Sequence, residues 1–200
     1  MTKVEDRRAD LKENLIRLAE AQIATFGLAS LRARDLAEKA GCAVGAIYNV
    51  FADLTALVIE VNGRTFARIG AEVAGAVTGR EAEAPEQRLI LLAYGYLNFA
   101  DQNHHLWRAL FDLDLPDDDK VPDWYRGELT KLFAHIAKPV SEVFQDLEGE
   151  ALNLMVRALF SSVHGIVILG LQNRISGVPR AQLEAMIKQV LLRISKRTVS

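Results

Sequence analysis

The sequence has a single cysteine, Cys42, so no disulfide bond can form within its 200 residues. Such sparse cysteine usage is typical of proteins that work in a reducing cytoplasm, where we expect this protein to be located. Cys42 follows Gly41, a place that favours a small packing side chain. A redox-sensing thiol is the alternative, although no Lys, Arg or His lies within two residues to stabilise a reactive thiolate.

A secretory signal and a long hydrophobic run are also missing. The N-terminal residues are charged and contain no apolar core of the kind that a signal peptide needs. The most apolar stretch, Ala158 to Leu171, is shorter than the ~20 residues that cross a bilayer, and it contains His164. We therefore expect a buried helix there and no membrane partner.

Positive charge is scarce for a protein that binds nucleic acid. The formal net charge is -2, and residues 1–50 hold eight Lys or Arg against seven Asp or Glu. Nucleic-acid-binding domains usually carry a basic surplus that attracts phosphate. Charge alone therefore does not indicate a DNA partner, and such a function has to be recognised from the arrangement of residues.

The motifs of metal sites and hydrolases are absent as well. The Glu-x-x-His motif of helix-bundle metal proteins occurs nowhere in the chain. His104 and His105 are adjacent, so a helix would direct them to different sides. No grouping of Ser, His and an acid follows from their spacing. We predict no catalytic residue, no metal site and no cofactor, and a helix-bundle enzyme is the rival class.

Sustained period-two alternation, which marks strands, is nearly absent, whereas apolar residues recur three and four apart throughout the chain. The predicted fold class is all-α with about nine helices. Gly27 is placed to end the first helix, and Asp53 to cap the fourth. Pro139 should kink or split the seventh, and Gly149 should end it. The expected helices cover residues 11–26, two short segments within 30–52, and residues 53–77, 89–100, 106–111, 122–147, 150–173 and 179–197.

Residues 30–57 carry the most specific pattern: a short helix, a glycine turn, a second short helix and the start of a third. Leu36 and Ala40 are spaced to bury one face, and Ile47 can close over it. Gly41 can supply the positive φ that a sharp turn between helices needs. The second short helix then leaves five residues for an outside partner: Ala43, Gly45, Ala46, Tyr48 and Asn49. This pattern predicts a helix-turn-helix that enters a DNA groove, and the alternative is a helix pair that packs against a partner protein.

The same segment carries a longer signature, which reads Ala40-Gly41-Cys42-Ala43, Gly45, Ile47-Tyr48, Asn49 and Phe51. With these residues, positions 9–69 resemble the N-terminal domain of the TetR family of transcriptional repressors. The resemblance implies a helix-turn-helix DNA-binding domain over residues 1–52 and a linking helix from residue 53. It also implies a C-terminal ligand-binding and dimerisation domain over residues 53–200.

The resemblance also implies which residues contact DNA. The second short helix would lie in the major groove, and the Tyr48 hydroxyl would bind a backbone phosphate. Arg32 and Arg34, at the start of the preceding helix, would hold the opposite strand through phosphate or base contacts. On the groove helix, Asn49 has the side chain suited to bidentate readout of adenine.

The sequence departs from the family pattern at two of these positions. Ala43 stands where Ser or Thr is common, and Leu54 stands where the fourth helix commonly opens with Lys. Ala43 and Ala46 can still meet thymine methyl groups. Because polar contacts are few, we expect DNA shape to contribute to recognition. Free N–H groups at the start of the fourth helix are a further candidate for phosphate, although Asp53 is acidic.

The C-terminal half contains aromatic residues that suit a pocket for a small apolar effector. His164 belongs to the segment 160–165, which resembles the C-terminal domain type named for Trp followed by His-Gly, with Phe160 in the place of Trp. For each aromatic residue a plain core position is the alternative, and for His164 a hydrogen-bonded core or interface position. The expected pocket residues are Tyr96, Phe99, Trp107, Phe111, Trp124, Phe133 and His164.

The helix expected over residues 150–173 is apolar on most sides, so most of its surface has to be covered. A second copy of the chain can provide that cover, and Gly165 and Gly170 would permit a close approach. We therefore predict a homodimer through residues 150–173 and 179–197, with a monomer as the alternative.

Together these features predict a repressor that binds a palindromic operator and is released by a small, largely apolar effector. A constitutive DNA-binding protein and a protein-interaction module without an effector are the alternatives.

Overall fold

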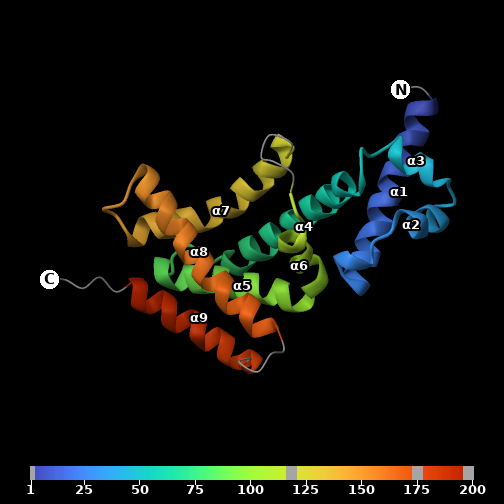
Figure 1. The fold of residues 1–200 in the computed structure, drawn as a ribbon. Coiled ribbons are helices and arrows are strands. Elements are labelled where there is room, and N and C mark those ends of the chain that lie inside the picture. The colour runs from blue at the N-terminus through green and yellow to red at the C-terminus, as the bar shows by residue number, and fades with distance from the viewer. Residues whose placement is uncertain (1–2, 116–120, 173–177, 196–200) are drawn as a thin grey trace. The chain divides into compact units, whose positions relative to one another are not determined.

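The computed structural model describes residues 3–115, 121–172 and 178–195, and within these ranges the fold is all-α, as predicted. The expected homodimer segments extend to residue 173 and to residues 196–197, which lie outside the described ranges. The described residues form nine α-helices, one short 3-10 helix and no strand. The elements are α1 (Lys3–Phe26), η1 (Leu28–Ser30), α2 (Ala33–Ala40), α3 (Val44–Tyr48), α4 (Leu54–Val77), α5 (Pro85–Gln102), α6 (His104–Asp112), α7 (Asp123–Val143), α8 (Gly149–Leu171) and α9 (Arg180–Ser195) (Figure 1).

The chain divides into two compact units. The first comprises residues Met1–Ala67 and Asn103–Glu128, and the second comprises Arg68–Gln102 and Leu129–Ser200. The helix α4 contributes its first part to one unit and its last part to the other. These units do not coincide with the expected domains 1–52 and 53–200, which stay a prediction.

The first unit is built around the apolar stripe of α1. Leu15 and Ile23 on that stripe are fully buried, and α2, η1 and α6 pack against α1. Leu36 of α2, Ile47 of α3 and Leu57 of α4 complete the same core, all with no exposed surface. Burial of a large aliphatic side chain contributes about 1.5–3 kcal/mol, so this cluster fixes the helix pair α2 and α3 on α1.

The turns of the first unit follow the expected local chemistry. Gly27 ends α1 with a φ of 80°, and Gly41 caps α2 with a φ of 66°. At the second turn the Cys42 N–H donates to the Ala37 carbonyl, at 3.0 Å. The cap predicted for α4 is confirmed, because Oδ1 of Asp53 accepts the Ala56 N–H at 2.7 Å. Residues with a positive φ and a capping carboxylate therefore set where these helices begin and end.

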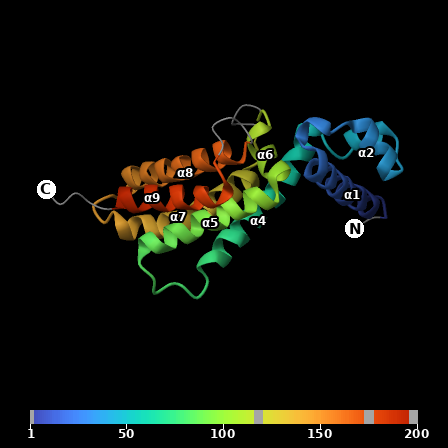
Figure 2. The same ribbon diagram turned by 90° about the horizontal axis from the view of Figure 1, so that it is seen from below.

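In the second unit α5, α8 and α9 lie side by side, with the last part of α4 and most of α7 completing the bundle (Figures 1 and 2). Leu97 of α5, Val167 of α8 and Ile187 of α9 have no exposed surface. Within this bundle Gly170 lies against Leu183, since a Cβ added at Gly170 would lie 2.2 Å from a Leu183 methyl group. Gly170 thus serves close packing of α8 on α9 within one chain, whereas a Cβ at Gly165 would meet no atom within 4 Å.

Two sequence-based boundaries are wrong. The helix α7 is not split at Pro139 but runs through it to Val143. Proline lacks the N–H that would bond to the carbonyl four residues earlier, but only one helical bond is lost so near the helix end. Gly149 does not end this helix. It begins α8 instead, with a φ of 54°, which suits a sharp entry into the new helix.

The helix α8 is long and apolar enough to cross a membrane by length and composition. In the second unit it packs against α5 and α9 through Val156, Leu159, Val163 and Val167, which are buried. Its opposite side carries Leu169, of which 63% of the surface is exposed. The helix α8 therefore has apolar residues on two faces, one buried in the bundle and one exposed.

Candidate DNA interface and candidate ligand cavity

The helix α3 presents a small, solvent-exposed face. Ile47 points into the core with no exposed surface, while Gly45, Tyr48 and Asn49 are exposed. Ala43, which precedes the helix, is also exposed, and Ala46 is half-buried. Four of the five residues predicted to contact DNA on this segment are therefore exposed, and the fifth is half-buried. Small side chains there permit a close approach of the helix backbone to a groove.

Two polar side chains stand at the end of this face. Tyr48 is 48% exposed, and no described residue forms a hydrogen bond with its hydroxyl group. Asn49 caps α3, and its N–H donates to the Gly45 carbonyl at 3.2 Å, while its side chain is exposed. A phenol and an amide that are exposed at the end of a short helix can reach a phosphate and a base edge.

Arg32 and Arg34 lie at the start of α2, and both are exposed. Nη1 of Arg32 donates to the carbonyls of Ala29 and Leu31, at 2.7 and 2.8 Å. These contacts orient the guanidinium group of Arg32 on η1 and leave its other N–H groups for an outside acceptor. The side chain of Arg34 makes no hydrogen bond or ion pair within the described ranges. Both arginines are thus available for the predicted contacts.

The start of α4, whose free N–H groups were a candidate for binding phosphate, is poorly suited to an anion. The Asp53 carboxylate accepts the Ala56 N–H, so it already binds one of the free N–H groups. Its negative charge also repels a phosphate at short range. In the first unit the candidate phosphate contacts therefore reduce to the arginines of α2 and to Tyr48.

A buried polar contact that the sequence analysis missed holds the helix pair in place. Gln22 of α1 is only 8% exposed. Its Oε1 accepts a hydrogen bond from Nζ of Lys39 at 2.6 Å, and its Nε2 donates to the Ser30 carbonyl at 3.0 Å. One side chain thereby joins α1 to η1 and to α2. The sequence could have indicated this contact, because Gln22 is a polar residue on the otherwise apolar stripe of α1.

Ion pairs join α1 to the first part of α4. Nζ of Lys12 lies 2.6 Å from Glu60, and Arg64 lies 2.5 Å from Glu13 and 3.9 Å from Glu20. The hydrogen bond from Arg64 lowers the pKa of Glu13, and the same bond raises the pKa of Arg64. Because these groups are partly exposed, solvent screens the attraction, and the pairs orient α4 more than they stabilise it.

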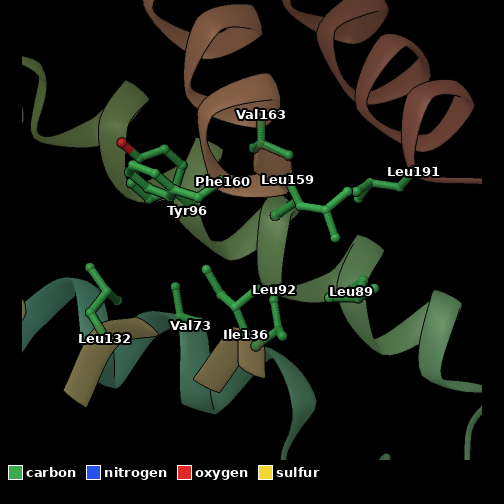
Figure 3. A pocket seen from close by; sticks show the side chains of 11 residues that line it. Val73, Leu89, Leu92, Tyr96, Leu132, Ile136, Leu159, Phe160, Val163 and Leu191 are labelled. Carbon is green, nitrogen blue, oxygen red and sulfur yellow. The ribbon is translucent and has the colours of Figure 1, made fainter. Parts of the chain in front are cut away.

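The second unit contains an almost wholly apolar cavity of about 50 Å³ (Figure 3). Five helices of this unit contribute to its wall. Of the seven residues predicted to line a ligand pocket, Tyr96 lies in this wall. The lining residues are Val73, Leu89, Leu92, Ala93, Tyr96, Leu132, Ile136, Leu159, Phe160, Val163 and Leu191.

Three of the predicted residues gather around Phe160. The Tyr96 hydroxyl lies 2.9 Å from Nδ1 of His164, and the ring of Phe160 stacks on His164 with its centroid 5.6 Å away. Phe160 also meets the rings of Tyr96 and Phe133 edge to face, at 5.8 and 5.1 Å between centroids. Figure 3 shows Tyr96 beside Phe160 in the cavity wall. Phe160 was not among the residues predicted to line the pocket.

Phe133 and His164 contact Phe160 without lining the cavity themselves, and the other four predicted residues do not line it either. Phe99 is buried in the second unit, away from the lining. Trp107, Phe111 and Trp124 belong to the first unit. There the fully buried Trp107 meets Phe111 edge to face, and the ring of Trp124 approaches Gly63. An abundance of aromatic residues could not reveal in which of two cores each residue is buried.

Metal-binding groups do not gather in the part of the chain that the structure describes. No group of three or more His, Cys, Asp or Glu side chains there is arranged to hold an ion. Cys42 is half-buried beside the turn at Gly41.

The C-terminal part of the chain is similar to a known domain family. Residues 89–193 match the family model described as the tetracyclin repressor-like C-terminal domain. This match covers more than half of the 200 residues. No curated protein matches the chain.

Solved structures share the fold over nearly the whole chain. A protein of unknown function from Rhodococcus sp. RHA1 superposes with a TM-score of 0.73 at 22% identity, covering 92% of this chain and 94% of that one. A TetR-family transcriptional regulator from Vibrio parahaemolyticus gives 0.63 at 22% identity, with 90% and 96% covered. RolR, in complex with its ligand resorcinol, gives 0.68 at 16% identity, with 95% and 89% covered.

Proposed function

Because this chain belongs to the TetR family of transcriptional regulators, we propose that it is a DNA-binding repressor controlled by a small ligand. In this proposal it binds a palindromic operator as a cytoplasmic homodimer and leaves the operator when a largely apolar effector occupies the cavity of the second unit. The observation that carries the proposal is the exposed face of α3, where the buried Ile47 anchors the helix and Tyr48 and Asn49 stand outside.

In the proposed complex α3 lies in the major groove, which admits an α-helix. Tyr48 contacts a phosphate, Arg32 and Arg34 hold the opposite strand, and Asn49 reads a base edge. The small residues at positions 43, 45 and 46 permit the close approach that this requires. Supporting this role, Ala43 and Gly45 are exposed in the first unit, while Leu36, Ala37 and Ile47 hold the helix pair in the core.

A second copy of the chain is proposed to cover the open face of α8 and α9. Leu154 and Leu169 of α8 are 60% and 63% exposed, and Met186 and Ile194 of α9 are also exposed. Isolated apolar side chains are common on surfaces, but several large ones on two adjacent helices favour a symmetric interface. A two-fold dimer presents two copies of α3, which is the reason for expecting a palindromic operator.

The effector is proposed to bind beside Tyr96, Phe160 and His164. An aromatic wall with one polar pair suits an apolar molecule that carries a hydrogen-bonding group. The observed volume of about 50 Å³ is small, because an engineered cavity that accommodates benzene measures about 150 Å³. Binding would therefore displace side chains, and the lining Phe160 is the largest that can move. RolR, which shares the fold, binds resorcinol, a small aromatic molecule.

The helix α4 provides a covalent route from the cavity to the DNA-binding unit. Val73 lines the cavity, and the same helix begins at Leu54, five residues after Asn49. A ligand releases DNA only if it binds the released state more tightly than the DNA-bound state. A typical coupling of about 1–3 kcal/mol would weaken operator binding by about 5- to 150-fold.

The test starts with selection of the preferred sequence from random DNA by the purified full-length protein. The proposal predicts an inverted repeat, bound by a dimer, and a lower affinity in the presence of resorcinol or another small apolar compound. Selection of a sequence without two-fold symmetry would contradict the operator proposal. An affinity that no compound of such a panel changes would instead favour the constitutive DNA-binding alternative.

A further inference from the structure

A second cavity, of about 220 Å³, adjoins the apolar one in the second unit and has charged residues in a partly apolar wall. Its wall includes Arg88 of α5, His135 and Lys138 of α7, and Glu81 from the turn before α5. Leu92 lines both cavities. Leu92 is thus the residue that the charged chamber and the apolar chamber share.

Arg88 is the most buried cation in this wall, and its side chain is 10% exposed. Its Nε donates to the Glu83 carbonyl at 3.2 Å, and Nη2 pairs with Glu142. These contacts use two of the five N–H donors of the guanidinium group. The other three have no acceptor within the described ranges. A largely buried arginine with unused donors can bind a further anion.

Lys138 adds a second positive charge beside Arg88. Its ammonium group makes no hydrogen bond within the described part of the chain, and neither does the imidazole of His135. Two carboxylates oppose these charges. Glu142 pairs with Arg88, and Glu81, which attracts Lys138 and Arg88, accepts the Gly79 N–H at 3.1 Å. Backbone hydrogen bonds lower the pKa of Glu81, so this carboxylate is ionised and held by the turn. Lys138 and Arg88 therefore keep donors for a further acceptor, although two carboxylates lie near them.

The two chambers form one elongated site along α5. Arg88, Leu92 and Tyr96 follow one another at intervals of four residues, so they share one side of the helix. The eight steps from Arg88 to Tyr96 span about 12 Å of helix. That length matches a medium-length alkyl chain or a substituted aromatic ring. Rotation of Leu92 would connect the charged end with the aromatic end.

We propose that the effector is an apolar carboxylate whose hydrocarbon part lies beside Tyr96 and whose carboxylate binds Arg88 and Lys138. This inference rests on the proposed function, and it names the chemical class of the effector. The carboxylate would complete the unused donors of Arg88, and the hydrocarbon would fill the apolar chamber. A neutral molecule would leave Lys138 and the remaining donors of Arg88 without this contact and would gain from the apolar chamber alone.

The test compares octanoate with 1-octanol, which have the same chain length and different head groups, by calorimetric titration of the full-length protein. Charge-assisted hydrogen bonds are worth about 1.5–3 kcal/mol, so octanoate should bind about tenfold or more tightly than octanol. Arg88→Gln and Lys138→Gln should reduce this preference. Glu81→Gln keeps an acceptor for Gly79 but removes the opposing charge, so it should increase the preference. None of the three variants should change octanol binding by more than about twofold.

Lys138 is exposed, so Lys138→Gln tests the site even if Arg88→Gln does not fold. Equal affinities for octanoate and octanol, or a preference that none of the charge variants changes, would overturn the proposal. Operator affinity measured in parallel separates this inference from the proposed switch. Octanoate that binds with the expected charge dependence but leaves operator affinity unchanged supports the carboxylate site and contradicts the switch. Operator release by resorcinol or octanol, with no preference for octanoate, would support the switch and contradict the carboxylate site.

Discussion

The Tyr96 hydroxyl forms a 2.9 Å hydrogen bond with Nδ1 of His164, and this bond joins α5 to α8 in the wall of the apolar cavity. Phe160 stacks on the same imidazole ring, so the polar pair is covered by an aromatic side chain. A half-buried pair of this kind both holds two helices together and supplies the polar point that an apolar ligand can use.

Removal of the Tyr96 hydroxyl should therefore destabilise the protein through its partner His164. We expect Tyr96→Phe to lower the free energy of unfolding by about 0.5–1.5 kcal/mol, the net value of one hydrogen bond. In a double-mutant cycle with His164→Phe, measured by urea denaturation, the two effects should couple by a similar amount. Tyr94→Phe is the matched control, because that hydroxyl bonds to the Glu184 carbonyl and should be additive with His164→Phe. Additivity of the Tyr96 and His164 effects would contradict the pair.

Asn49 and Tyr48 should affect DNA binding in different ways. Asn49→Ala should lose about 1–3 kcal/mol of discrimination at one base position, because a bidentate amide contact to adenine would be removed. Tyr48→Phe should weaken all sequences by a similar factor, because a phosphate contact carries no sequence information. Affinities for a series of single-base operator variants, at one fixed salt concentration, measure both effects. An unchanged base preference in Asn49→Ala would remove Asn49 from direct readout.

The helix pair and its turns could be predicted because local chemistry determines them. Gly41 adopts a positive φ, which few other residues tolerate, and Asp53 caps the helix that follows it. The spacing of Leu36 and Ile47 also identified the buried face, and both are fully buried. These features depend on residues a few positions apart, which a sequence displays directly.

The cavity depends on contacts between residues far apart in the chain. Its lining residues were therefore predicted less well from the sequence than the helix pair was. Trp107 and Trp124 are aromatic residues that were predicted to line the same pocket as Tyr96, but they belong to the first unit. Gly170 was expected to serve contact between two copies, whereas it packs against Leu183 of the same chain. Periodicity shows that a residue is buried, and it does not show which partner covers it.

The contact between Gly170 and Leu183 leads to a stability prediction. A methyl group at position 170 would lie 2.2 Å from Leu183, which is 1% exposed and has little room to move. Gly170→Ala should therefore destabilise the protein by about 1–3 kcal/mol through overpacking, less what alanine gains as a helix former. Gly75→Ala is the control, because nothing lies within 4 Å of a Cβ on that exposed position of α4. It should stabilise by about 0.5–1 kcal/mol. Equal denaturation midpoints for the two variants would contradict the close approach.

The ion pair between Glu13 and Arg64 predicts a small pH dependence of stability. The hydrogen bond from Arg64 lowers the pKa of Glu13 in the folded state, below its ordinary value of 4.5. A carboxylate of this kind stabilises the fold above its unfolded pKa and loses that effect as the pH falls through the folded pKa. Glu13→Gln should thus lower the urea midpoint slightly at neutral pH and leave it unchanged well below pH 4.5. Glu38→Gln, which removes an exposed carboxylate with no ion pair in the described ranges, should show no such difference.

The open face of α8 determines whether the proposed operator symmetry is available at all. If a second copy covers Leu169, a charge at this position would be buried against an apolar partner surface, and burial of an unpaired charge is costly. Leu169→Glu should therefore shift the protein from dimer to monomer in sedimentation equilibrium, and operator affinity should fall with it. Phe26→Glu is the matched control, because Phe26 is an equally exposed apolar residue on α1, at 68% against 63% for Leu169. A wild-type monomer, or a dimer unaffected by Leu169→Glu, would contradict this interface.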